Sequence, residues 1–202
     1  MTRCLVTDRR RLCPGARSFA DARRGLVEQA RRAAADGIDL IHVRERDLAA
    51  ADLAALVADV VAVTRGSATR VVVNDRIDVA LACGADGVHL RADSVPVAEA
   101  RRLLPAPRLV GRSVHSVQEA IAASDADYLI AGTVFPSASK STGPLAAELL
   151  GIEGLRAIVN ASAVPVLAIG GITPDRIDSV LAAGAAGIAA IGLFIDSLKT
   201  AS

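Results

Sequence analysis

The sequence predicts an α/β fold, a single (β/α)8 TIM barrel that spans residues 1–202. Short apolar runs alternate along the chain with longer Ala-rich segments of helical period. There are eight such runs, and a similar junction phrase recurs at four helix ends, which indicates one repeated unit. A length of 202 residues is enough for one barrel of this kind.

The eight runs are expected to be parallel strands, with seven helical stretches between them. They cover residues 4–7, 40–44, 70–73, 87–90, 108–111, 127–130, 164–169 and 187–191. The junctions at 34–41, 82–88, 123–129 and 182–188 place Gly or Asp where each helix should end, since these residues tolerate the left-handed conformation.

Helix starts are expected at Ser18, at Ser116 with Glu119 three residues later, and at Pro174 after Thr173. The last helix has only residues 193–202 available. The runner-up is a doubly wound sheet, but no Gly-x-Gly-x-x-Gly follows the first strand.

Composition limits the partners and the compartment. A formal charge of +1 gives no global field for nucleic acid or anionic membrane. The first eleven residues contain no signal-peptide core, and no apolar run is long enough to span a bilayer. Three cysteines without metal spacing fit a reducing cytoplasm. The sequence leaves the oligomeric state open, although Ala-rich outer helices could pack against a second copy.

Glycines after the seventh and eighth strands are candidates for phosphate binding. In such barrels the site lies at the carboxyl ends of the strands. Gly170, Gly171 and Gly192 carry no Cβ, so their amides can approach phosphate oxygens closely. The alternative for Gly170-Gly171 is an ordinary tight turn. Two glycine sites at adjacent strand ends favour phosphate.

Polar residues follow the other strands. Alternation puts Leu40, His42 and Arg44 on one face of the second strand, so His42 and Arg44 line the pocket if that face points inward. The alternative for the Arg-Glu-Arg-Asp run at 44–47 is a solvated charge cluster. Further candidate ligand contacts are Arg46, Asn74 and Ser113.

The remaining candidates are a lysine and two histidines. Lys140 lies in a long loop after the sixth strand, where it could meet phosphate or be a surface lysine. His89 is assigned to packing or capping, and His115 is left open between capping and ligand contact.

Six ordered phrases resemble the thiamine phosphate synthase and TenI (thiazole tautomerase) superfamily. They are Ile41-His42-Val43-Arg44-Glu45-Arg46, Val73-Asn74-Asp75-Arg76, Gly84-Ala85-Asp86-Gly87-Val88-His89-Leu90, Gly111-Arg112-Ser113-Val114-His115-Ser116, Gly132-Thr133-Val134-Phe135-Pro136 with Lys140, and Ala168-Ile169-Gly170-Gly171-Ile172-Thr173-Pro174. The resemblance implies the same barrel and a small-molecule thiazole phosphate as ligand.

The synthase branch joins a pyrimidine diphosphate to the thiazole phosphate nitrogen. The resemblance implies Mg²⁺ held by two carboxylates, with Gln, Arg and Lys around the leaving diphosphate. Asp75 matches one carboxylate, while the second falls on Ser94 with Asp93 as its acidic neighbour. His42 replaces the Gln, Arg46 replaces one Lys, and Lys140 matches the other. These departures count against the synthase.

The residues of these motifs resemble those of the TenI branch more closely. The tautomerase of that branch moves a proton and needs no cofactor. Its catalytic histidine falls on Thr133, so His42 or His115 would have to carry the proton. The leading hypothesis is therefore a TenI-like protein of thiamine biosynthesis with His42, Thr133 and Lys140 as catalytic candidates. The alternatives are the synthase, with Mg²⁺ at Asp75 and Asp93, and a binder of thiazole phosphate without turnover.

Overall fold

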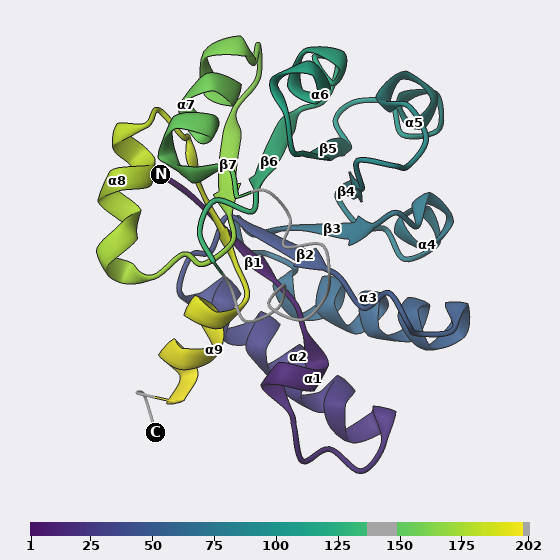
Figure 1. The fold of residues 1–202 in the computed structure, drawn as a ribbon. Coiled ribbons are helices and arrows are strands. Elements are labelled where there is room, and N and C mark those ends of the chain that lie inside the picture. Colours follow the sequence, from purple (N-terminus) through teal and green to yellow (C-terminus); the bar gives the residue numbers. More distant parts are fainter. Residues whose placement is uncertain (137–148, 200–202) are drawn as a thin grey trace.

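The computed structural model is a closed barrel of parallel strands surrounded by helices (Figure 1), and it describes residues 1–136 and 149–199. The strands pair in chain order, and the first pairs with the eighth. They are β1 Thr2–Val6, β2 Leu40–Val43, β3 Arg70–Asn74, β4 Gly87–Leu90, β5 Leu109–Val114, β6 Tyr128–Gly132, β7 Val166–Ile169 and β8 Gly187–Ala190. The predicted TIM barrel is confirmed.

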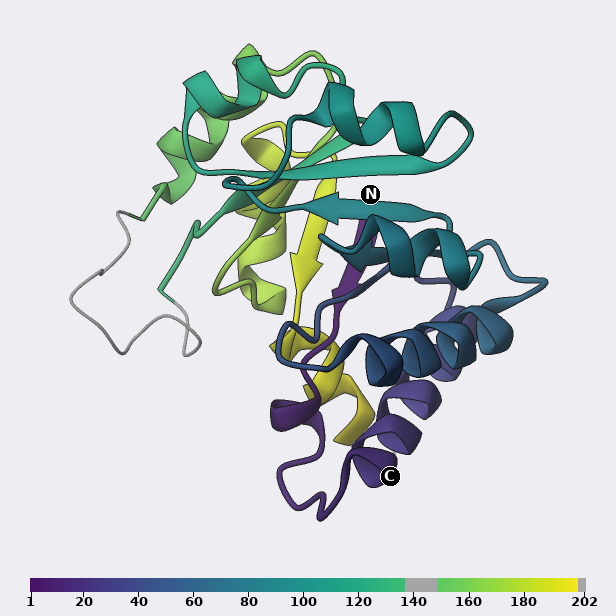
Figure 2. The same ribbon diagram turned by 90° about the vertical axis from the view of Figure 1, so that its right-hand side faces the viewer.

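The helices form the outer layer. They are α1 Arg9–Leu12, α2 Phe19–Ala35, α3 Ala50–Thr64, α4 Ile77–Ala82, α5 Val97–Leu103, α6 Val117–Ala122, α7 Gly151–Ala161, α8 Ile177–Ala182 and α9 Gly192–Lys199, with a 3-10 turn at Pro174–Arg176. Figures 1 and 2 both place α9 beside α1 and α2. Phe194 of α9 packs against the same apolar cluster as Leu12 and Phe19, so the short last helix still closes the ring.

Alternation along the strands separates two layers of core. Leu40 and Val72 belong to a cluster inside the barrel, together with Tyr128 and Leu167 from the opposite side. The intervening side chains face outward and pack under the helices. Because one face fills the barrel and the other meets helices, the strands are apolar on both faces.

The repeated junction ends the helix and also caps the neighbouring strand. Gly37, Gly84 and Gly184 adopt φ values of +67°, +67° and +94° directly after their helices, as predicted. The third junction differs, since among the described residues only Asp75 has a positive φ outside glycine.

Aspartates in three of the junctions cap the preceding strand. Asp39, Asp86 and Asp127 each accept a backbone N–H, from Arg3, Val71 and Val110, at 2.6–2.7 Å. The repeated Asp therefore fixes the closed end of the barrel, away from the site.

Two predicted helix starts are confirmed in detail. The Ser18 hydroxyl accepts from the Asp21 N–H, and that of Ser116 accepts from the Glu119 N–H. The Glu119 carboxylate accepts from the N–H of His115 at 2.6 Å. None of the helices in the described ranges is both long and apolar enough to cross a lipid bilayer.

Candidate functional site

A cavity of about 1100 Å³ opens at the carboxyl ends of the strands. Side chains from β2, β3, β4 and β5 line one side of it, and residues at the ends of β6, β7 and β8 line the other. Because the strands pair in chain order around a closed barrel, β2–β4 lie across the cavity from β7–β8. The volume is large for one small ligand and sufficient for two.

The face of β2 that carries His42 and Arg44 points into the cavity, as alternation predicts. Both side chains line it, whereas Ile41 and Val43 pack outward under the helices. Arg44 is half-buried, and its pKa is lowered by burial and by the neighbouring guanidinium of Arg46. Arg44 forms no salt bridge among the described residues, so its guanidinium is available to an anion in the cavity.

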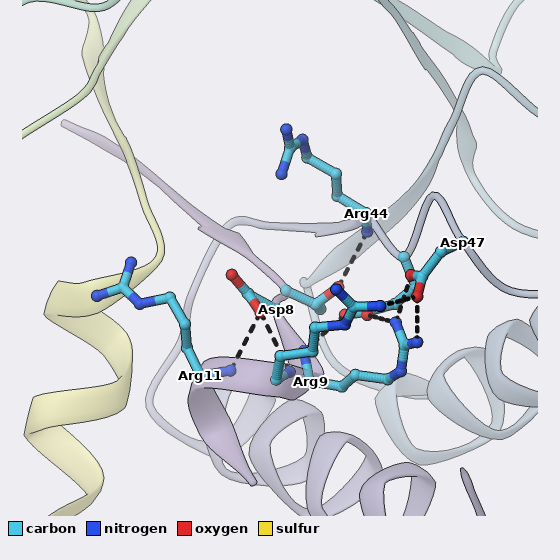
Figure 3. A network of polar contacts seen from close by, with 8 residues as sticks. Asp8, Arg9, Arg11, Arg44 and Asp47 are labelled. Carbon is cyan, nitrogen blue, oxygen red and sulfur yellow. Dashed lines mark hydrogen bonds and ion pairs between the residues drawn. The ribbon is translucent and has the colours of Figure 1, made fainter. Parts of the chain in front are cut away.

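The charge run at 44–47 divides between two roles (Figure 3). Arg44 and Arg46 line the cavity. Glu45 is almost fully buried and accepts from the Arg9 backbone N–H at 3.0 Å and from its Nη1 at 2.9 Å. Asp47 pairs with the same guanidinium at 2.5 Å. The alternating charges thus anchor the segment after β1 while the two intervening arginines face the ligand space.

Two neutral histidines form the polar floor of the cavity. His42 Nε2 lies 3.2 Å from Asn74 Oδ1, and its Nδ1 is buried with no partner in the described part of the chain. His89 Nδ1 lies 3.1 Å from the Tyr128 hydroxyl, and Nε2 lies 2.9 Å from the Ser113 hydroxyl. The two rings lie 4.6 Å apart. His89 is buried with both nitrogens hydrogen-bonded, in keeping with the packing role expected of it, and it also lines the cavity.

Burial determines the protonation state of both imidazoles. It lowers the pKa of His89 to about 3, with Arg112 and Arg44 contributing. The pKa of His42 is lowered well below its usual range by burial, then by His89 and Arg44. General acid–base catalysis works best with a pKa near the working pH. Burial therefore favours the neutral form of His42, which suits hydrogen bonding to a ligand.

The glycines after β7 and β8 line the opposite side of the cavity. Gly170 and Gly171 have φ values of +102° and +62°, conformations that disfavour any side chain. Gly192 begins α9 and lines the same space, and the start of a helix is a favourable place for an anion. The Arg176 guanidinium donates to the Gly171 carbonyl at 2.8 Å and lies over the Phe135 ring.

The end of β6 carries no imidazole at the position of the predicted catalytic residue. Thr133 is buried and lines the cavity beside Gly170. His115 also lines it, and its Nδ1 hydrogen-bonds to the Gly132 carbonyl. Lys140 lies outside the described residues.

The two candidate magnesium carboxylates do not form an open metal site. Asp75 Oδ1 accepts the Arg91 backbone N–H at 3.0 Å, and Oδ2 lies 3.6 Å from Arg91 Nε. Asp93 pairs with Arg91 Nη2. Within the described ranges, no three His, Cys, Asp or Glu side chains cluster as metal ligands. A hexacoordinate cation that needs oxygen ligands does not fit here unless Arg91 moves away.

Sequence reasoning overlooked three arginines of the cavity, Arg11, Arg91 and Arg176. Arg91 directly follows β4, so the rule that polar residues at strand ends build the site would have found it. Arg11 comes from α1, a one-turn helix with no pattern that separates it from a loop. Figure 3 shows its side chain extending toward α9.

Comparison with known proteins places most of the chain in one family. The family model described as thiamine monophosphate synthase matches residues 12–194. The chain is 45% identical over 174 residues to the thiamine-phosphate synthase of Methanoregula boonei, covering 85% of this chain and 79% of that protein. It is 39% identical over 181 residues to that of Moorella thermoacetica, covering 89% and 85%.

A solved structure agrees with these relatives. The thiamine phosphate pyrophosphorylase of Pyrococcus furiosus superposes with a TM-score of 0.77 at 36% identity, covering 95% of this chain and 85% of that one. A 3-hexulose-6-phosphate synthase with a TM-score of 0.68 and 18% identity shares the fold alone. From the family match, the identity of these relatives and the barrel itself, we conclude that the chain belongs to the thiamine monophosphate synthase family.

Proposed function

We propose that the chain is a thiamine phosphate synthase, which joins a pyrimidine diphosphate to thiazole phosphate and releases diphosphate. The observation that carries the proposal is a single cavity with two anion-binding sides. Glycine amides lie at β7–β8, and Arg44, Arg46 and Arg91 lie across from them at β2–β4. The substrate of a tautomerase carries one phosphate and one carboxylate, so it offers the arginine side less negative charge than a diphosphate does.

In this proposal the glycines and the start of α9 hold the thiazole phosphate. Backbone amides at a helix start suit a phosphate because they carry partial positive charge and cost no side-chain ordering. Gly170, Gly171 and Gly192 would therefore fix the ring nitrogen toward the centre of the cavity. Holding both reactants in one orientation supplies much of the rate gain in a two-substrate reaction.

The arginine side would bind the diphosphate as it leaves. The bond between the pyrimidine methylene carbon and the diphosphate oxygen breaks, and its electron pair goes to the diphosphate. The thiazole nitrogen lone pair forms the new carbon–nitrogen bond, which leaves the ring positively charged. Guanidiniums of Arg44 and Arg46 stabilise the charge that develops on the departing oxygens.

The neutral floor would orient the pyrimidine. His42 and Asn74 form one hydrogen-bonded pair and His89 and Ser113 another, both facing the cavity. Neutral donors and acceptors suit an uncharged ring better than charged groups would, since they bind it without a buried unpaired charge. The low pKa of both histidines supports this role over proton transfer.

The relatives named thiamine-phosphate synthase support the synthase over the TenI-like reading that the sequence phrases favour. The test is to incubate the chain with both substrates, with and without Mg²⁺, and to measure thiamine phosphate and free diphosphate. Equal formation of the two products supports the proposal. Isomerisation of a thiazole carboxylate phosphate without coupling, or binding without turnover, would overturn it.

A further inference from the structure

Arg91 occupies the position between two carboxylates where the family resemblance expects a metal ion. It is the first residue after β4, and its half-buried side chain lines the cavity. Asp75 holds its backbone N–H and lies close to its Nε, and Asp93 pairs with Nη2. Both candidate metal ligands are therefore already ion-paired with the Arg91 guanidinium, Asp75 at 3.6 Å and Asp93 more closely.

The contacts leave one edge of the guanidinium available. Among the described residues, Nε faces Asp75 and Nη2 faces Asp93, while Nη1 has no hydrogen-bond partner. Asp75 does not line the large cavity, and the Asp93 side chain is 68% exposed. An exposed pair contributes little. The carboxylates thus orient Arg91 without fully neutralising it.

A second arginine, Arg112 on β5, hydrogen-bonds to the loop that carries Arg91 and Asp93. The Arg112 guanidinium donates to the carbonyl of Val95 at 2.6 Å, of Ala92 at 2.8 Å and of Ser94 at 3.3 Å. Three carbonyl contacts on one planar group hold the loop in a single shape. The Arg91 side chain therefore starts from a fixed backbone, which reduces the ordering cost of binding an anion.

Two more cations face the same space from β2. Arg44 and Arg46 line the cavity, and Arg91 is one of the charges that lower the pKa of Arg44. Three guanidiniums that repel one another are stabilised when a multiply charged anion enters between them. An arginine can bond two phosphate oxygens at once, which suits it to a diphosphate.

We propose that Arg91 binds the diphosphate directly, in the place of a divalent cation between Asp75 and Asp93, so that diphosphate binding by this chain does not require Mg²⁺. The inference rests on the proposed function in taking diphosphate as the ligand of the arginine side. It goes beyond that function by stating that no metal ion is needed between the two carboxylates and the diphosphate.

The test is calorimetric titration with inorganic diphosphate, in EDTA and in Mg²⁺. The wild-type chain should bind in EDTA, with an affinity that Mg²⁺ changes by less than about threefold. Arg91→Met should weaken binding in EDTA by at least about tenfold, because it removes a charge-assisted contact. Arg102→Met is the matched control, since Arg102 is an exposed partner of Glu99 on α5 outside the cavity, and it should bind as the wild type does.

A second readout follows the metal alone. Mn²⁺ titration monitored by electron paramagnetic resonance should find no tight site in the wild type. A weak site should appear in Arg91→Met, where the two carboxylates lose their cation. If Arg91→Met fails to fold, Arg91→Lys retains the charge and should still lose part of the diphosphate affinity, because a lysine cannot bond as a fork.

Any one of three results would overturn the inference. They are diphosphate binding by the wild type only with Mg²⁺, unchanged diphosphate affinity in Arg91→Met, and tight Mn²⁺ binding by the wild type. These results are separate from the fate of the proposed function. Strictly Mg²⁺-dependent synthesis of thiamine phosphate would refute the role of Arg91 and leave the synthase standing. Metal-free diphosphate binding through Arg91 without any synthesis would do the reverse.

Discussion

Gly192→Ala separates ligand binding from stability at the side of the cavity where we propose that the phosphate binds. A Cβ at this position would lie 3.1 Å from Arg11 Nη2, the far end of a flexible side chain, with no backbone atom among its near contacts. The φ of Gly192 is outside the range that strains other residues. Replacing Gly by Ala at such a site changes the free energy of unfolding little, or raises it by about 0.4–1 kcal/mol.

The same methyl group would stand where a phosphate oxygen should approach the Gly192 amide. Loss of one hydrogen bond to a charged group costs about 1.5–3 kcal/mol, so the affinity for thiazole phosphate should fall by about 10- to 150-fold. Calorimetric titration gives the affinity, and urea unfolding gives the stability. Gly15→Ala is the matched control, because a Cβ there meets nothing within 4 Å.

Gly171 would be a poorer probe of the same side. Its φ is +62°, and a Cβ would lie 2.4 Å from the Pro136 carbonyl oxygen and 2.8 Å from the Phe135 Cβ. A substitution there would displace the segment after β6 as well as the ligand. If Gly192→Ala binds within about threefold of the wild type at unchanged stability, the phosphate is not seated at the start of α9.

Three further predictions follow from the other contacts of the site. Arg44→Met should weaken inorganic diphosphate binding at least about tenfold without lowering the melting temperature, because burial already disfavours this cation; equal affinity in titration would contradict it. Glu45→Ala should cost about 1–3 kcal/mol in urea unfolding, since it removes two hydrogen bonds to Arg9 while the pair of Arg9 with Asp47 remains; a loss under about 0.5 kcal/mol would argue against a role of Glu45 in anchoring Arg9. As pH falls from about 6.5 toward 5, His89 should lower the free energy of unfolding by up to about 1.4 kcal/mol per pH unit, because only the unfolded chain takes up a proton at this residue. His89→Gln should reduce this dependence of stability on pH in thermal melts. An unchanged dependence would mean that His89 is protonated in the folded chain.

The barrel could be predicted from the sequence because its signals are local and repeated. Alternation on β2 also placed His42 and Arg44 in the cavity, since the period of two fixes which side chains share a face. The glycines at 170, 171 and 192 followed from their places at strand ends. Each of these inferences needs only the spacing of residues along the chain.

Contacts between distant segments could not be predicted in the same way. Nothing near Arg91 indicates that its guanidinium would pair with Asp75, 16 positions earlier, and so close the expected metal site. The partners of His89 come from other strands, since its two nitrogens lie within hydrogen-bond distance of Tyr128 on β6 and Ser113 on β5. Pairings of this kind depend on the register of strands that the chain does not encode locally.

In the proposed function, one cavity holds two anions on opposite sides. A crystal structure of the chain with thiazole phosphate and inorganic diphosphate tests this directly. We expect the single phosphate to lie against Gly170, Gly171 and Gly192, and the diphosphate against Arg44, Arg46 and Arg91. Both anions on the same side of the barrel, or a diphosphate bound away from the β2–β4 arginines, would contradict it.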